Sequence, residues 1–153
     1  MKKFLTLVFF LTLIILSQST IFPHCEVPCG IYNDEMRFTM LIENIQTIEK
    51  AMQQVIQLSE ESPQNMNQAV RWIMNKEKHA EEIQNIISQY FLTQRIKNVE
   101  SGDERAAEKY IEKLTLCHQI LVYAMKTKQT TDLDNVKKLT SLVGKFKKVY
   151  FTK

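Results

Sequence analysis

The spacing of apolar residues after residue 33 limits the fold more than any other feature of this chain. Apolar side chains recur there in steps of three and four, which places them along one face of an α-helix. The 153 residues include only 3 glycines and 3 prolines, and two of those prolines and one glycine lie within residues 23–30. Few helix-ending residues remain elsewhere, and no alternation typical of strands is visible. We therefore expect an all-α fold.

Two long helices are expected in the first half of the chain. The first runs from about Asp34 to Leu58. The Ser62–Pro63 pair has the character of an N-cap and a first-turn proline, and it introduces the second helix. Polar residues near Lys76 interrupt the apolar face of that helix. The residues expected to face the core are Leu41, Ile45, Ile48, Met52 and Val55 on the first helix, and Met66, Ala69, Ile73, Ala80, Ile83, Ile87 and Tyr90 on the second.

Two more helices are expected in the second half. Residues Ser101–Glu104 have the spacing of a capping box, and Thr131–Asp134 places acidic residues at the positive end of a helix dipole. Because the connections are short, neighbouring helices should be antiparallel, giving an up-down-up-down four-helix bundle. Cys117 is expected to act as a small hydrophobic core residue. The expected core positions are Ala107, Tyr110, Leu114, Cys117, Leu121 and Ala124, followed by Leu133, Val136, Thr140, Val143, Phe146 and Tyr150.

The N-terminal segment has the composition of an export signal. Lys2 and Lys3 precede the apolar run Phe4–Leu16, and small residues follow at Ser17–Ser19. The apolar run is short for a membrane span, which needs about 20 residues. We expect residues 1–23 to be removed in one or two cuts by a maturation protease, and the protein to be exported to a periplasm, the exterior or an organelle lumen. The alternative is an uncleaved N-terminal anchor.

The net charge of +3 is small for a chain of this length. It gives no reason to expect nucleic acid as a partner, or a membrane surface after processing.

An irregular segment with concentrated chemistry, residues 24–33, precedes the first helix. Cys25 and Cys29 are four residues apart in a stretch bent by Pro28, so both thiolates can point to one centre. Gly30 can adopt positive φ and turn the backbone back. His24 adds an imidazole and, if it is the mature N-terminus, an amine.

A chain that begins at His24 would offer an unusual set of metal ligands. The amine, the amide nitrogen between His24 and Cys25, and the Cys25 thiolate close two chelate rings in one plane, and Cys29 completes a square. Square ligand sets suit Ni(II) or Cu(II), whereas zinc prefers a tetrahedron. Anionic thiolates and an amidate also stabilise Ni(III), and the His24 imidazole would add an axial ligand. The segment therefore favours a redox nickel site.

The pattern His-Cys-x-x-Pro-Cys-Gly-x-Tyr at His24–Tyr32 resembles the nickel hook of the nickel superoxide dismutase family at every fixed position. The resemblance implies a hook at residues 24–33 on a bundle of residues 34–153, one nickel ion per chain, and a homohexamer. It implies ligation by His24, Cys25 and Cys29. It also implies conversion of superoxide to oxygen and hydrogen peroxide through a Ni(II)/Ni(III) cycle.

The same resemblance implies further site residues. Tyr32 corresponds to the tyrosine over the open face of the metal, and Tyr90 to the tyrosine paired with it, so both are catalytic candidates. Glu26 stands where many members have Asp. In the family, an Arg and a Glu together support the axial imidazole. His79 occupies the position of that Arg, and Thr39 or Met40 occupies the position of that Glu. Arg95 or Lys97 is an alternative source of positive potential for superoxide.

Two other functions remain open on the sequence. An exported helical binding module could join Cys25 to Cys29 in a disulfide, since oxidising compartments favour disulfides. A nickel or copper carrier could use the same ligands without turnover, but it would not require Tyr32 with Tyr90.

Overall fold

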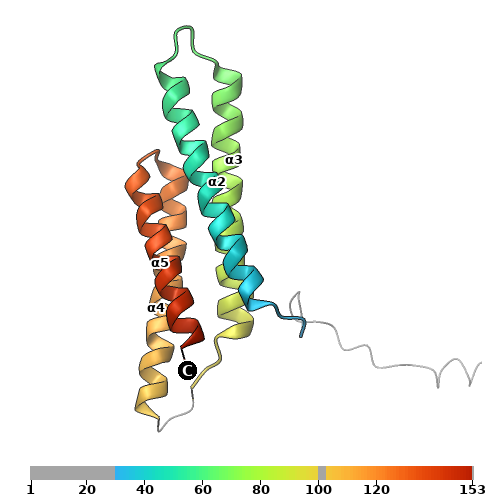
Figure 1. The fold of residues 1–153 in the computed structure, drawn as a ribbon, viewed down its shortest axis with the longest axis vertical. Coiled ribbons are helices and arrows are strands. Elements are labelled where there is room, and N and C mark those ends of the chain that lie inside the picture. The colour runs from blue at the N-terminus through green and yellow to red at the C-terminus, as the bar shows by residue number, and fades with distance from the viewer. Residues whose placement is uncertain (1–29, 100–102, 153) are drawn as a thin grey trace, which may run out of the picture.

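The computed structural model of the protein describes residues 30–99 and 103–152. Four helical rods run antiparallel, and Figure 1 shows them as two hairpins packed side by side. Their elements, labelled as in Figure 1, are α2 (Asp34–Glu60), α3 (Met66–Asn85) continued by η1 (Ile86–Arg95), α4 (Glu104–Gln129) and α5 (Leu133–Phe151). The expected all-α, up-down-up-down bundle is confirmed. No helix in the described ranges is both long and apolar enough to cross a membrane.

Each of the four rods begins at a polar residue whose side chain accepts a hydrogen bond from the first turn. Asn33, Asn65, Asp103 and Asp132 are these N-caps, and the bond from the Met36 amide to Asn33 is 3.0 Å long. Such caps satisfy amides that have no partner within the helix. The expected cap at Ser62–Pro63 is wrong, because Asn65 caps α3 three residues later. At the start of α4 the cap is Asp103, and Ser101 lies outside the described residues.

Packed aromatic rings join the start of α2 to η1 and α5. The Phe38 ring lies 4.9 Å from Phe91, 5.3 Å from Phe146 and 5.6 Å from Tyr150, measured between centroids. These rings come from α2, η1 and α5, and Phe38, Phe91 and Phe146 are fully buried. Tilted and edge-on ring pairs add to the stabilisation from burial. This cluster gives the start of α2 a rigid support.

The polar interruption at Lys76 has a structural role. Lys76 is buried, and its ammonium group donates to the carbonyl oxygens of Lys128, at 2.7 Å, and Thr130, at 3.2 Å. These carbonyls lie at the end of α4, where backbone acceptors lack helical partners and the helix dipole is negative. Burial lowers the pKa of Lys76, and Glu77 opposes that shift. Lys76 therefore fixes the end of α4 against α3.

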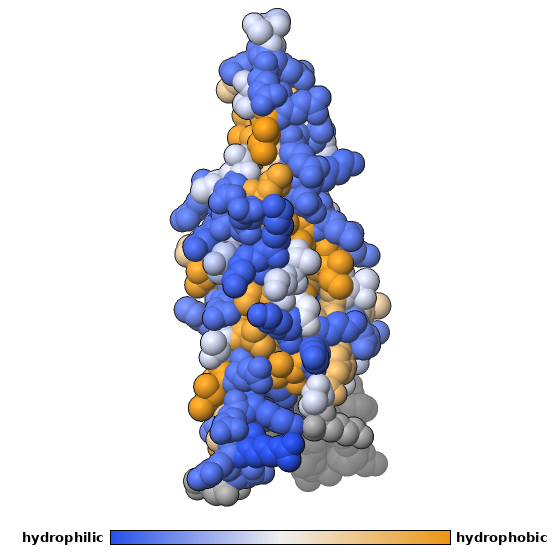
Figure 2. Space-filling model, turned by 60° about the vertical axis from the view of Figure 1, so that its left-hand side comes forward, coloured by the Kyte–Doolittle hydropathy of each residue, from blue (hydrophilic) through white to orange (hydrophobic). Residues whose placement is uncertain are grey.

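The α2–α3 hairpin projects beyond the end of the α4–α5 hairpin (Figure 1). Four apolar residues of α3, at helical spacing in this half of the helix, are exposed: Met66, Val70, Ile73 and Met74. The expectation that Met66 and Ile73 face the core is therefore wrong, because α4 and α5 do not reach this level. On the face drawn in Figure 2, hydrophobic patches likewise extend into the projecting end.

The last ten residues of the second rod form a π-helix, which the apolar spacing did not predict. Its backbone bonds span five residues, as between the Ile96 amide and the Phe91 carbonyl at 2.8 Å. In an α-helix, residues five apart point about 140° away from each other, at 3.6 residues per turn. The wider π turn reduces this angle. Tyr90 and Arg95 can therefore reach the same partner.

Candidate functional site

The three proposed metal ligands, His24, Cys25 and Cys29, lie outside the described residues, as does Glu26. The first described residue is Gly30, whose φ is +75°. Positive φ was expected there, and glycine adopts it without steric cost. The following residues Ile31, Tyr32 and Asn33 lead directly into α2. The described part of the hook is therefore its junction with the bundle.

Tyr32 and Tyr90 lie together at that junction, as the resemblance implied. Their ring centroids are 5.9 Å apart with the planes at 76°, an edge-to-face contact. Tyr32 is 40% exposed and Tyr90 only 3% exposed. Tyr32 therefore faces solvent on top of a buried Tyr90.

Asp34, in the first turn of α2, joins three rods beneath this tyrosine pair. Its Oδ1 accepts from the Tyr90 hydroxyl at 2.6 Å and from Arg95 Nε at 2.8 Å. Its Oδ2 accepts from an Arg95 terminal nitrogen at 2.6 Å and from the Tyr150 hydroxyl at 3.0 Å. Two parallel bonds from one guanidinium are the strongest arrangement for such a pair.

The pKa values at this cluster follow from its hydrogen bonds. Burial alone would raise the pKa of Asp34, but bonds from Arg95, Tyr90 and Tyr150 outweigh it and leave the pKa below its ordinary value. Burial and the bond to Asp34 raise the pKa of Tyr90, and the same causes raise that of Tyr150 to about 12. Asp34 is therefore ionised at neutral pH and both phenols keep their protons.

Two guanidinium groups cover the tyrosine rings. Arg95 lies over Tyr32, with its central carbon 4.4 Å from the ring centroid, and Arg37 lies over Tyr90 at 4.8 Å. Cations are attracted to aromatic faces in this arrangement. The charge of Arg95 is compensated by Asp34, at 2.6 Å. Among the described residues, no carboxylate forms an ion pair with Arg37.

His79 lies on α3, and the structure does not bring it to the tyrosine pair. Eleven residues separate it from Tyr90 along one rod, roughly 15 Å at the helical rise. Its Nδ1 lies 2.6 Å from Asn44 Oδ1, and an amide oxygen only accepts, so His79 donates. The partner is thus Asn44, and not Thr39 or Met40, which occupy the position of the family's Glu. Thr39 instead donates to the Glu35 carbonyl.

Elsewhere the described residues offer no competing metal centre. No three His, Cys, Asp or Glu side chains within residues 30–99 and 103–152 are arranged to hold a metal ion. Cys117 is buried as expected, and burial raises the pKa of its thiol to about 12. A thiol with this pKa stays protonated near neutral pH, whereas metals bind the thiolate. Cys117 is a core residue.

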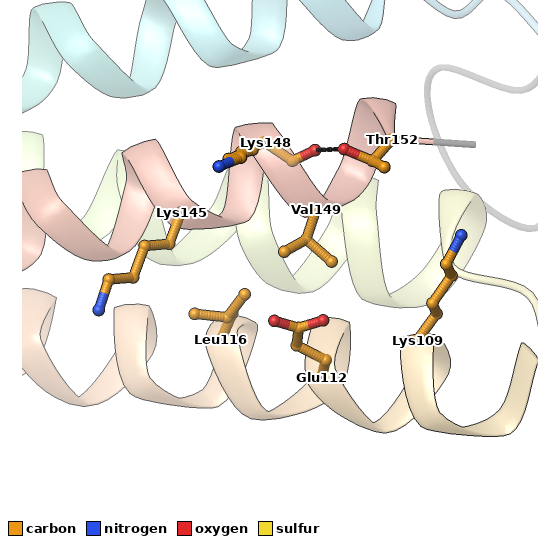
Figure 3. Close-up of a pocket in the computed structure, with 7 residues that line it drawn as sticks. All are labelled: Lys109, Glu112, Leu116, Lys145, Lys148, Val149 and Thr152. Atoms are coloured by element: carbon orange, nitrogen blue, oxygen red, sulfur yellow. Dashed lines mark hydrogen bonds between the residues drawn. The ribbon is translucent and has the colours of Figure 1, made fainter. Parts of the chain in front are cut away.

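A pocket lies between α4 and α5 (Figure 3). Its residues are Lys109, Glu112, Leu116, Lys145, Lys148, Val149 and Thr152. The hydrogen bond drawn in it, at 2.7 Å, joins the Thr152 hydroxyl to the Lys148 carbonyl within one helix. The pocket contains no histidine, cysteine or tyrosine, so its chemistry differs from that of the tyrosine pair.

The sequence did not reveal Asp34, Tyr150, Arg37 or Asn44 as parts of a site. Asp34 had the ordinary appearance of an acid in the first turn of a helix, and Tyr150 that of a core residue. The separation of five residues between Tyr90 and Arg95 is a weak signal that they share a partner. It can be used only when the segment is known to form a π turn, which brings residues five apart to the same side.

Comparison with protein families gives a match over residues 19–153 to the family described as nickel-containing superoxide dismutase. Neither the curated proteins nor the solved structures that were compared gave a match. The matched range includes the hook sequence, the tyrosine pair and all four rods. The chain belongs to the nickel-containing superoxide dismutase family, oxidoreductases that act on superoxide with a nickel cofactor.

Proposed function

We propose that this protein dismutates superoxide at a nickel ion held by the hook at residues 24–33, next to the tyrosine pair. The observation that carries the proposal is the contact between Tyr32 and Tyr90 at 5.9 Å, directly beyond the hook sequence. A structural cysteine pair or a metal carrier would not require an exposed phenol ordered there. This contact favours the enzyme over both alternatives.

The donor set suits nickel. The proposed ligands are the His24 amine and imidazole, the Cys25 amide and thiolate, and the Cys29 thiolate, with one ion per chain. A planar set of such donors suits nickel, and the anionic thiolates and amidate donate electron density that stabilises the higher oxidation state. When bound, nickel would supply a one-electron Ni(II)/Ni(III) couple, with which one superoxide could be oxidised to oxygen and a second reduced, with two protons, to hydrogen peroxide.

The residues of the bundle contribute access, charge and protons. Tyr32, the exposed member of the pair, restricts access and orders water or a small anion with its hydroxyl. Tyr90 forms the floor beneath it. Arg37, which has no ion-pair partner among the described residues, supplies positive potential for the incoming anion. Arg95, the earlier candidate, is less suited because Asp34 compensates its charge.

His79 and Glu26 are proposed as supporting groups for the hook. Because His24, Cys25 and Cys29 bind one ion, this role would place the ion between the levels of Tyr90 and His79, which are roughly 15 Å apart along the rod. Asn44 accepts the Nδ1 proton of His79, so the other ring nitrogen is left for a partner such as the His24 imidazole.

We also propose that residues 1–23 direct export and are removed by a maturation protease to free the His24 amine. The basic and apolar composition of the segment supports this. A homohexamer is proposed from the resemblance. The exposed apolar face of Met66, Val70, Ile73 and Met74 supports association with further copies, since monomers rarely expose large apolar patches.

The three cysteines provide the test. Serine replacements at Cys25 and at Cys29, in protein that begins at His24, should abolish nickel uptake and dismutase activity. A Cys117→Ala change is the matched control and should retain both. Equal nickel uptake by all three variants would contradict the proposed site, and retained activity in Cys25→Ser would contradict the function.

A further inference from the structure

Asp34 is fully occupied by neighbouring side chains. A carboxylate has about four acceptor positions, two on each oxygen. Two donors reach Oδ1 and two reach Oδ2, at 2.6 to 3.0 Å. No acceptor position is left for a metal ion, a substrate or a proton in transfer. Asp34 is therefore suited to hold other residues and not to act on substrate.

The bond from Tyr90 to Asp34 separates the roles of the two tyrosines. The Tyr90 hydroxyl donates its proton to Asp34 Oδ1, with 2.6 Å between the two oxygens. Tyr90 therefore cannot donate that proton to an anion above the ring. In the described part of the chain, the Tyr32 hydroxyl makes no hydrogen bond to another residue. Tyr32 is thus the member of the pair whose phenol is available to substrate or water.

Asp34 also controls the group that holds Tyr32 in place. Its two bonds orient the Arg95 guanidinium, and that planar group lies 4.4 Å from the centre of the Tyr32 ring. The π turn is needed for this arrangement, because it places Tyr90 and Arg95 on one carboxylate. π segments occur frequently at functional sites.

We propose that Asp34 is a positioning residue of the dismutase: through Arg95 and Tyr90 it fixes Tyr32, and with it the point where the hook meets the bundle. This inference rests on the proposed function of the hook. It assigns Tyr90 to the support of Tyr32, and leaves Tyr32 as the phenol that faces the reaction.

The test compares Asp34→Asn with Glu35→Gln, which removes the same charge from the next residue of α2. Glu35 is exposed and pairs with Lys147, so it has no part in the cluster. The first measurement is the ring NMR signal of Tyr32 in the nickel-free full chain. Asp34→Asn should move that signal to the position of a mobile, exposed tyrosine, while Glu35→Gln should leave it unchanged.

A second variant separates loss of position from loss of folding. Arg95→Lys keeps the charge but cannot form two parallel bonds to one carboxylate. It should also release Tyr32, with helix content unchanged by circular dichroism. An unchanged Tyr32 signal in folded Asp34→Asn or folded Arg95→Lys protein would overturn the proposal.

The rate at which the protein loses nickel gives an independent test of the role of Asp34. In processed protein that binds nickel, Asp34→Asn should release the ion to a chelator about tenfold faster than Glu35→Gln, and equal release rates would count against a role in holding the hook. If the unaltered protein binds no nickel, the proposed function fails. The ring NMR comparison still decides the role of Asp34.

Discussion

Asp34 at the start of α2 and Arg95 at the end of η1 are joined by two hydrogen bonds, of 2.6 and 2.8 Å. The pair connects the first rod to the last turn of the second, directly below the ring of Tyr32. It lies next to the buried aromatic cluster, at the junction between the hook and α2. An ion pair of two hydrogen bonds is therefore located where the hook joins the bundle.

The cluster around Asp34 predicts how stability depends on pH. The pKa of Asp34 is below 3.8, so its contribution is complete above pH 3.8 and is lost as the pH falls through the folded-state pKa. The pKa values of Tyr90 and Tyr150 are raised, so their contribution is complete below pH 10 and is lost as the pH rises, for Tyr150 toward about 12. The raised pKa of the buried Cys117 thiol, about 12 against an ordinary 9.0, adds to the alkaline loss from about pH 9. Urea midpoints should therefore fall below pH 3.8 and above about pH 9.

Tyr150→Phe is the control for the loss of stability at alkaline pH. This variant removes one titrating group, so its urea midpoint should fall less than that of the unaltered protein between pH 10 and 12. Identical alkaline slopes would show that Tyr150 does not contribute.

Lys76 should be important for stability although it lies far from the tyrosine pair. Lys76→Met would leave the carbonyls of Lys128 and Thr130 without their donor and should lower the free energy of unfolding by about 1–3 kcal/mol. Lys78→Met, at an exposed position two residues later, should change it by less than about 0.5 kcal/mol. Chemical denaturation measures the free energy of unfolding of both variants. A similar loss in the two would contradict the role of Lys76 in fixing the end of α4.

Arg37 should act on substrate capture through its charge. Arg37→Gln is expected to lower kcat/KM by up to about tenfold at low ionic strength, with the difference shrinking as salt screens the charge. Arg71→Gln, an exposed change in the projecting half of α3, serves as the control and should have little effect. Steady-state rates over a salt series test this. A deficit that is the same at every salt concentration would show that Arg37 does not attract the anion.

The exposed face of α3 should mediate association between copies. Val70→Glu and Met74→Glu place charges on this face and should shift sedimentation toward smaller species. Met125→Glu alters another exposed apolar side chain, on α4, and should leave the assembly intact. An unchanged sedimentation profile in the α3 variants would exclude this face from the interface.

Much of the fold follows from the chain itself. The apolar spacing predicted Leu41, Ile48 and Met52 as core residues of α2, and all three are fully buried. It failed for Met66 and Ile73 on α3, because burial there depends on how far α4 and α5 extend. Spacing along one helix carries no information about the length of its neighbours.

The site was predictable only where the sequence resembles a family motif. The hook pattern and the pairing of Tyr32 with Tyr90 came from that resemblance, and the structure places the two tyrosines in contact. The Asp34 cluster depends on a π turn and on Tyr150, which lies 116 residues away along the chain. Neither has a compositional signal, so this part of the site required the three-dimensional structure.

The most direct test of the nickel hook is the intact mass and nickel content of the protein purified from its native host. A mass that begins at His24, with one nickel ion per chain, is the predicted result. A mass that retains residues 20–23, lacks two hydrogens and carries no nickel would indicate a Cys25–Cys29 disulfide and would contradict the proposed metal site.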